Sequence, residues 1–231
     1  MKQIYIQGLV DERYIRPLEH IGNLFFEDTK VLFSEPEEKA DLHVHFETEV
    51  NGNEFTVRGK LEELEDGKLF DSKADLSGLT EKDIFKQMKK AISKSYLLML
   101  QEYTGMVQKW GILTGIRPTK LLHRHMQNQT PIEEAHQALR EEYLMSEEKI
   151  NLMQKIIDRQ LAVIPDLYDL KKEVSIYIGI PFCPTKCAYC TFPAYAINGR
   201  QGSVFSFLGG LHYEIEKIGE WLKEKDRKSV V

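Results

Sequence analysis

Cysteine is scarce in this chain, and its few copies are crowded together. The 231 residues include three cysteines, all within the eight residues from Cys183 to Cys190. A secreted domain held by disulfides would spread an even number of cysteines along its length. Three clustered cysteines instead indicate metal or redox chemistry in a reducing compartment, which predicts a cytoplasmic protein.

Long apolar runs and an excess of basic charge are also missing. No stretch approaches the roughly 18 to 20 apolar residues that a transmembrane helix needs, and residues 1–20 are too polar for a signal peptide. The formal net charge is −5, which gives no reason to expect binding to nucleic acid. Hydrophobic residues make up 42% of the chain, as in an ordinary globular protein.

The first 105 residues predict a small α+β domain. Runs rich in β-branched and aromatic residues alternate with polar ones, and Asn51-Gly52-Asn53 is typical of a hairpin turn. Thr80 is a suitable N-cap for a long amphipathic helix, and Pro17 fits only the first turn of a shorter one or a break in it. The predicted strands are 2–10, 30–33, 41–50, 54–61 and 67–76, and the predicted helices are 11–22 and 81–103.

Residues 106–170 predict a helical connector, in which Pro131 takes the first position of one helix and Ser146 opens another. From residue 171 the pattern changes. Val174–Ile180 is a run of β-branched and aromatic residues, which predicts a strand buried on both faces of a parallel sheet. A helix is expected at 203–225. The predicted fold class is therefore α/β, in three parts: 1–105, 106–170 and 171–231.

The cysteine spacing C-x3-C-x2-C restricts the kind of metal site. Zinc normally takes four protein ligands, or three and a water with histidine prominent. There is no fourth cysteine, and the nearest downstream histidine, His212, is expected inside the final helix. Three thiolates suit a 4Fe-4S cluster with one open iron, whereas electron-transfer ferredoxins use four cysteines. Zinc and a metal-free group of cysteines remain as alternatives.

The same residues carry a family resemblance. C-x3-C-x2-C with an aromatic residue, Tyr189, before the last cysteine resembles the signature of radical S-adenosylmethionine enzymes. The longer phrase IYIGIPFCPTKCAYCTFPAY resembles the oxygen-independent coproporphyrinogen III oxidase family. GILTGIRPTKLLH, earlier in the chain, resembles the coproporphyrinogen dehydrogenase-like branch of that family, which has a long N-terminal extension.

This resemblance implies roles for five residues. Three of them, Cys183, Cys187 and Cys190, would each ligate one iron of a 4Fe-4S cluster. Tyr177 and Tyr189 would contact S-adenosyl-L-methionine bound at the open iron, and no side chain is assigned as catalytic. The implied reaction is the oxidative decarboxylation of coproporphyrinogen III to protoporphyrinogen IX in haem biosynthesis, with an unidentified electron donor. The last part would be the first βα unit of a partial TIM-like barrel.

The sequence departs from the family pattern in two ways, and both affect the function that we expect. A barrel generally requires on the order of 200 residues, far more than follow Val174, so we expect a truncated, inactive chain whose Ser229-Val-Val opens a second strand. Phe192 stands where well-characterised coproporphyrinogen enzymes carry a further cysteine, which related haem chaperones also lack. A haem-binding chaperone without decarboxylase activity is therefore the alternative function. A metal-stabilised interaction domain is a third.

Other polar residues give weaker signals. His43 and His45 share one face of a predicted strand but have no third ligand, so we interpret them as surface histidines. Arg117 and Lys120 suit an anion such as a propionate at a helix start. They suit equally a loop that docks the N-terminal part onto the barrel.

Overall fold

The computed structural model describes residues 1–64, 67–115, 117–169, 173–197, 202–226 and 228–230. The chain divides into two compact units, residues 1–160 and residues 161–231. Each unit is described by itself. Together they give a mixed α/β protein, as predicted, whereas the barrel stays a prediction.

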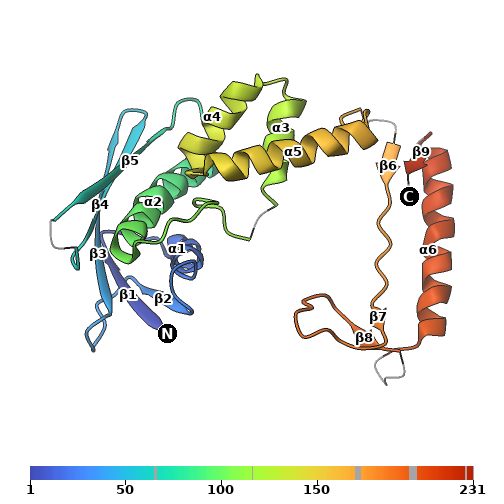
Figure 1. Cartoon of the computed structure of the whole chain (residues 1–231), viewed down its shortest axis with the longest axis horizontal. Helices are drawn as coiled ribbons and strands as arrows, with labels where there is room; N and C mark the ends of the chain where they lie inside the picture. The colour runs from blue at the N-terminus through green and yellow to red at the C-terminus, as the bar shows by residue number, and fades with distance from the viewer. Residues whose placement is uncertain (65–66, 116, 170–172, 198–201, 227, 231) are drawn as a thin grey trace. The chain divides into compact units, whose positions relative to one another are not determined.

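A five-stranded mixed sheet forms the base of the first unit (Figure 1). Its strands are β1 (Lys2–Gln7), β2 (Thr29–Leu32), β3 (Leu42–Asn51), β4 (Glu54–Leu61) and β5 (Leu69–Asp75). They lie in the order β2-β1-β3-β4-β5. Strand β1 pairs in parallel with β2 and β3, and the other neighbours are antiparallel. All five predicted strands of this part are confirmed, each with its ends shifted by no more than a few residues.

The hairpin between β3 and β4 turns where the sequence predicts. Asn51 pairs with Glu54, so that Gly52 and Asn53 form the turn. Gly52 has a φ of +60°, in the left-handed region that glycine adopts without strain. The Asn53 carbonyl accepts a hydrogen bond from the amide of Leu76 at 2.7 Å, which ties the turn to the end of β5.

Helices cover one face of the sheet (Figure 1). A short 3-10 turn, η1 (Glu12–Tyr14), leads into α1 (Ile15–Gly22), which carries Pro17 in its first turn as predicted. The long helix α2 (Glu81–Thr104) begins at Thr80, whose hydroxyl accepts a hydrogen bond from the amide of Asp83. It ends at Gly105, which has a φ of +69°. Both predicted ends of α2 are thus confirmed to within a residue.

The core of the first unit lies between the sheet and these two helices. In β4, every second residue from Phe55 to Leu61 is buried, and the residues between them are polar: Thr56, Arg58 and Lys60. The buried face meets the apolar stripe of α2, which includes Ile92, Tyr96 and Met99. This alternation in the strand and helical spacing in α2 explain why the two elements pack together.

Three further helices complete the first unit's helical part: α3 (Thr119–Gln127), α4 (Ile132–Tyr143) and α5 (Glu147–Val163). They bury Leu122, Ala135, Leu139, Ile150, Met153 and Ile157. Helix α5 begins after Ser146, as predicted. Pro131 was expected at the first helical position, but its ψ of 140° is extended, so α4 begins one residue later.

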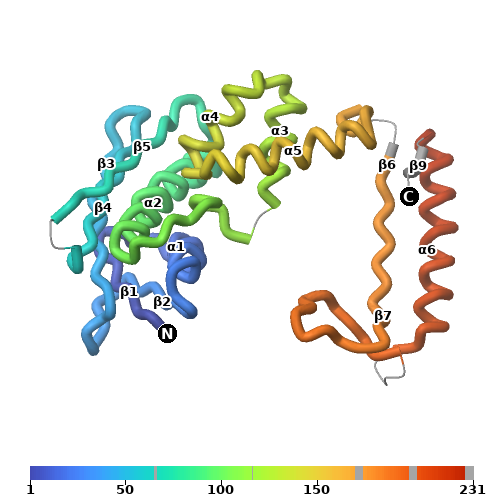
Figure 2. The backbone as a smooth tube through the Cα atoms, viewed as in Figure 1, coloured from blue at the N-terminus to red at the C-terminus, as the bar shows by residue number. Residues whose placement is uncertain are grey.

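The second unit contains one βαβ arrangement. Strand β6 (Glu173–Ser175) is followed by α6 (Val204–Glu224) and then by β9 (Lys228–Val230), which pairs in parallel with β6 (Figure 2). Helix α6 begins at Ser203, whose hydroxyl accepts a hydrogen bond from the amide of Ser206 at 3.3 Å. The pairing of Ser229 with Val174 confirms that a second strand opens there; Val231 lies outside the described residues.

The strand predicted at Val174–Ile180 is shorter than expected. Its ladder ends at Ser175, which pairs with Val230, the last residue of β9. Beyond that point Tyr177, Ile178 and Ile180 are exposed, so the predicted burial on both faces is wrong for the chain as described. A strand becomes buried on both faces only when neighbouring strands and covering helices surround it. Among residues 161–169, 174–197 and 202–226, Leu222 is the one buried residue.

Candidate metal-binding site

The cysteine loop is closed by a very short parallel ladder. Strand β7 (Phe182–Cys183) pairs with β8 (Tyr195–Ala196). The amide of Tyr195 donates to the carbonyl of Pro181 at 2.7 Å, and the amide of Ile197 donates to the carbonyl of Cys183 at 3.3 Å. The loop between these strands therefore leaves the first cysteine and returns beside it.

All three cysteines are free thiols on this loop. The amide of Cys190 donates to the carbonyl of Cys187 at 3.0 Å, which makes a turn between the second and third thiols. Cys183 and Cys190 are partly buried, and Cys187 is exposed. Among the residues that the structure describes, no three histidine, cysteine or carboxylate side chains lie close enough to hold a metal ion.

An apolar cavity of about 450 Å³ adjoins the loop. Cys183 and Cys190 both line it, together with the predicted cofactor residue Tyr177. The rest of its wall is largely apolar and comes from Gly179, Ile180, Pro181, Phe192, Pro193, Ala194 and Phe207. The structure thus brings together two of the three predicted ligands and one of the two predicted cofactor residues. Neither Cys187 nor Tyr189 is part of this lining, and Tyr189 is 88% exposed.

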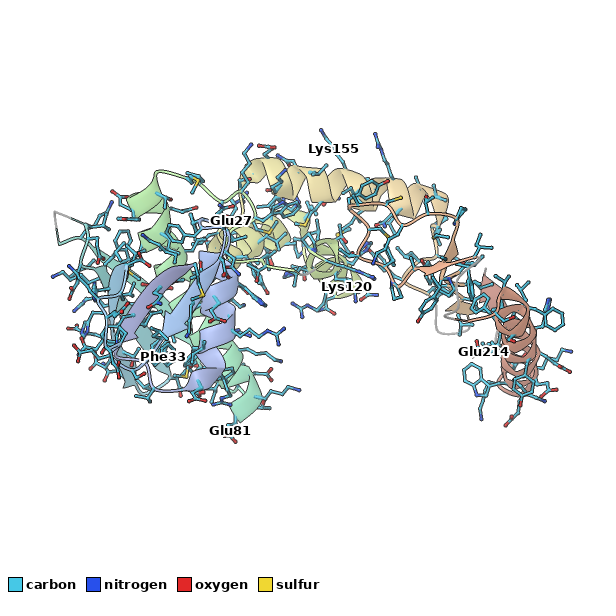
Figure 3. The ribbon with its side chains drawn as sticks, turned by 90° about the horizontal axis from the view of Figure 1, so that it is seen from below. Glu27, Phe33, Glu81, Lys120, Lys155 and Glu214 are labelled. Carbon is cyan, nitrogen blue, oxygen red and sulfur yellow. The ribbon has the colours of Figure 1, made fainter. Side chains whose placement is uncertain are left out.

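A second cavity, of about 280 Å³, lies beside the first. It is formed by Ile176, Tyr177, Ile178 and Gly179 on one side and by α6 on the other. Tyr177 and Phe207 line both cavities. Glu214 of α6, labelled in Figure 3, is the one charged residue in the lining of the second cavity.

The sequence around the site lacks negative charge. From Val174 to Tyr213 there is no aspartate or glutamate, although Lys186 and Arg200 are present. The thiolate is the form of cysteine that binds metals, and it meets no carboxylate from its own segment. Three thiols without a competing carboxylate, two of them on an apolar cavity, fit a group that is bound through thiolates and left partly open.

Phe182 is a residue of the site that the sequence reasoning missed. It directly precedes Cys183, and its ring lies 6.0 Å from that of Tyr195 and 5.5 Å from that of Phe207, between ring centroids. The cysteine motif and the longer phrase around it assign no role to this side chain. Its place beside a predicted ligand was the available signal.

The weaker candidates lie elsewhere, in the first unit. Nδ1 of His43 is 2.9 Å from a carboxylate oxygen of Glu63, and its ring meets Tyr5 edge-on. Nε2 of His45 lies 3.9 Å from the carboxylate oxygen Oε1 of Glu47. Lys120 is exposed on the first turn of α3 (Figure 3), and Arg117 is exposed just before that helix.

In the described part of the chain, no helix is long and apolar enough to cross a membrane.

Comparison with curated proteins supports the resemblance seen in the sequence. The chain is 54% identical over 230 residues to the oxygen-independent coproporphyrinogen-III oxidase-like protein HemZ of Bacillus subtilis (strain 168). The match covers 98% of this chain and 45% of the relative, so the chain spans less than half of the relative's length. No protein-family model matches the chain. The resemblance predicted from the two motifs is therefore confirmed.

Proposed function

We propose that this chain carries the cluster-binding part of a radical S-adenosylmethionine oxidoreductase of haem biosynthesis. The observation that carries the proposal is the cysteine loop, which places Cys183 and Cys190 on one apolar cavity. The similarity to the oxygen-independent coproporphyrinogen-III oxidase-like protein of Bacillus subtilis supports the same reaction type.

In this proposal Cys183, Cys187 and Cys190 hold a 4Fe-4S cluster through one thiolate each. Because only three thiols are offered, one iron is left for the amino and carboxylate groups of S-adenosyl-L-methionine. When bound, the two cofactors supply the radical chemistry that removes hydrogen from a substrate propionate. The chain itself contributes the ligands, the apolar wall that limits water, and the orientation of the loop.

Tyr177 and Tyr189 are the proposed contacts to S-adenosyl-L-methionine. Tyr177 supports this role by lining the same cavity as two thiols. Both tyrosines are 88% exposed, and an aromatic ring contributes most to binding when it is desolvated on both faces. We therefore expect this chain alone to bind the cofactor weakly and to show no turnover.

The proposed reaction of the whole protein is the decarboxylation of two propionates of coproporphyrinogen III to the vinyl groups of protoporphyrinogen IX. Cleavage of S-adenosyl-L-methionine would take up one electron through the cluster, and each propionate, after losing a hydrogen atom, would release one electron together with carbon dioxide. We therefore also propose an electron donor, still unidentified, that reduces the cluster. The parallel pairing of β6 with β9 across α6 supports a barrel that begins at residue 171. Residues 1–105 and 106–170 are the proposed N-terminal domain and connector. The clustered thiols favour a reducing, cytoplasmic location.

Anaerobic reconstitution with iron and sulfide tests the cluster. We expect a visible charge-transfer band, an EPR signal after reduction, and iron and sulfide that are lost together when the cysteines are replaced. Uptake of zinc alone, with no cluster signal, would rule the proposal out. The reaction is tested in the longer protein by following the conversion of coproporphyrinogen III to the divinyl product.

Phe192 favours a second candidate, a haem-carrying chaperone that keeps the cluster. It lines the cavity at the position where well-characterised coproporphyrinogen enzymes have another cysteine. Haem titration and substrate turnover in the longer protein separate the two functions. Stoichiometric haem binding without vinyl product would support the chaperone, and clean formation of the divinyl product would eliminate it.

A further inference from the structure

An aromatic contact joins the cysteine loop to α6, and the proposed function gives it no role. Phe182, on β7, meets Phe207 of α6 at 5.5 Å with the ring planes at 65°. It also meets Tyr195 of β8 at 6.0 Å. These contacts form an aromatic cluster of Phe182, Tyr195 and Phe207. Through Phe182 this cluster connects the residue next to Cys183 with both the return strand and the helix.

The backbone alone gives the loop little support. Strands β7 and β8 have two residues each, so their ladder offers few hydrogen bonds. Phe207, in contrast, belongs to a helix of 21 residues that is capped at Ser203. Rings at these distances and angles attract each other beyond the area that they bury. The side chain of Phe207 therefore ties a two-residue ladder to a long, capped helix.

Phe207 also stands where the site's cavities meet. It lines the cavity that holds Cys183 and Cys190, and it lines the second cavity together with Tyr177. A smaller side chain at this position would remove part of the wall of both cavities. It would also remove the contact between Phe207 and the ring of Phe182, the residue that directly precedes Cys183.

We propose that Phe207 is a positioning residue for the cluster ligands. Through Phe182 it holds β7 beside α6, and so keeps Cys183 on the cavity that Cys190 also lines. The inference rests on the proposed function, because it takes the three cysteines as ligands of one cluster. It adds a residue outside the cysteine motif on which the geometry of that motif depends.

Phe205 provides a matched control on the same helix. It lies two residues before Phe207, is 87% exposed, and lines neither cavity. Replacing either phenylalanine by alanine removes the same atoms from α6 and changes its helix propensity equally. A difference between the two variants therefore reports the contacts of Phe207 rather than the composition of the helix.

The test uses the 231-residue chain with Phe207→Ala, Phe205→Ala and Phe207→Tyr. Two rates are measured: the reaction of the metal-free, reduced thiols with Ellman's reagent, and the loss of iron from the reconstituted chain to a chelator. We expect Phe207→Ala to accelerate both by roughly threefold to tenfold, the factor that one aromatic pair contributes. Phe205→Ala and the ring-conserving Phe207→Tyr should stay near the unsubstituted chain.

Equal rates for Phe207→Ala and Phe205→Ala would overturn the inference. If Phe207→Ala weakens the helical circular dichroism of the chain, Phe182→Ala decides the question. It removes the ring contact with Phe207, together with that to Tyr195, and leaves the sequence of α6 unchanged. The double variant should then show less than the product of the two single effects, since both substitutions remove the contact between Phe182 and Phe207. Additive effects would contradict the proposed route through Phe182.

The two proposals fail in different ways. If the unsubstituted chain takes up no cluster, the proposed function is wrong, and the thiol reaction of the metal-free variants still decides the role of Phe207. If the cluster forms but its release is the same in all variants, the function stands and the positioning role is overturned.

Discussion

The two units of this chain differ in how completely they bury their side chains. In residues 1–160, a sheet and two helices enclose a continuous core that includes Ile4, Phe46 and Tyr96, and further helices bury a second set. In the second unit, among residues 161–169, 174–197 and 202–226, Leu222 alone is buried. The residues that predict chemistry nevertheless lie in this second, more open unit.

The contrast shows that a chemical motif and a hydrophobic core carry separate information. The three cysteines are placed by a turn and a two-residue ladder, both of which depend on residues close in sequence. A core requires side chains from elements far apart in sequence to meet. The cysteine motif can therefore be recognised in the sequence even though its unit buries little apolar surface.

The largest effect is expected for the cysteines, and it sharpens the contrast. Replacing Cys183, Cys187 or Cys190 by alanine should lower bound iron per chain by more than about tenfold, because two thiolates cannot complete a three-ligand site. The adjacent, exposed Thr191→Ala should keep it. Iron analysis after anaerobic reconstitution measures this. Full iron retention in any cysteine variant would contradict the ligand assignment.

A pair of phenylalanine substitutions compares the packing of the two units directly. Phe46→Ala empties a buried position of the first unit, and we expect it to lower the free energy of unfolding by about 3–5 kcal/mol. Phe205→Ala changes an exposed side chain of the second unit and should cost less than about 0.5 kcal/mol. Urea denaturation measures both. Similar losses of unfolding free energy in the two variants would contradict the difference in burial between the two units.

A smaller effect is expected at the start of α2, the helix that covers the sheet. Thr80→Ala removes the hydroxyl that accepts from the amide of Asp83, and should lower the free energy of unfolding by about 1 kcal/mol. Thr80→Ser keeps an acceptor and should cost only a few tenths of that. Urea denaturation of the two variants gives the comparison, and equal losses would argue against the cap.

The smallest effect is a pH dependence in the same helix turn. The hydrogen bond from Lys86, and then that from Thr80, hold the pKa of Asp83 below its ordinary value of 3.8. A carboxyl group with a lowered pKa in the folded state contributes stability above its unfolded pKa, and this is lost as the pH falls through the folded value. Acidification below about pH 4 should therefore weaken the first unit.

The control for this pH dependence is Asp83→Asn. It should be less stable than the unsubstituted chain at neutral pH and should approach it in strongly acidic solution, where Asp83 is protonated. Urea midpoints across this range measure the difference between the two proteins. A difference that does not depend on pH would show that the charge of Asp83 plays no part.

Much of the first unit could be predicted because its signals are local. The hairpin at Gly52 follows from residues that tolerate a positive φ, and the start of α2 follows from the side chain of Thr80. The length of the strand after Val174 could not be predicted in the same way. Its residues have the composition of a buried strand, but a ladder forms only where a partner lies beside it, and β9 reaches only to Ser175.

The candidate site, too, has features that could be predicted from the sequence and features that could not. The spacing of the three cysteines and of Tyr189 is a property of the sequence, and it was sufficient to predict a thiolate-bound cluster. The sequence could not tell that Cys183 and Cys190 share a cavity while Tyr189 lies outside its lining. Nor could it tell that the ring of Phe182 meets that of Phe207, 25 positions later in the chain.

For this protein, the sequence alone predicted most of the kinds of element, the order in which they occur and the side chains that we propose as metal ligands. Each of these depends on interactions between residues a few positions apart. The tertiary structure decided which apolar faces are covered, which thiols line a common cavity and which aromatic ring supports them. Those features depend on contacts between distant segments, which local propensities do not specify.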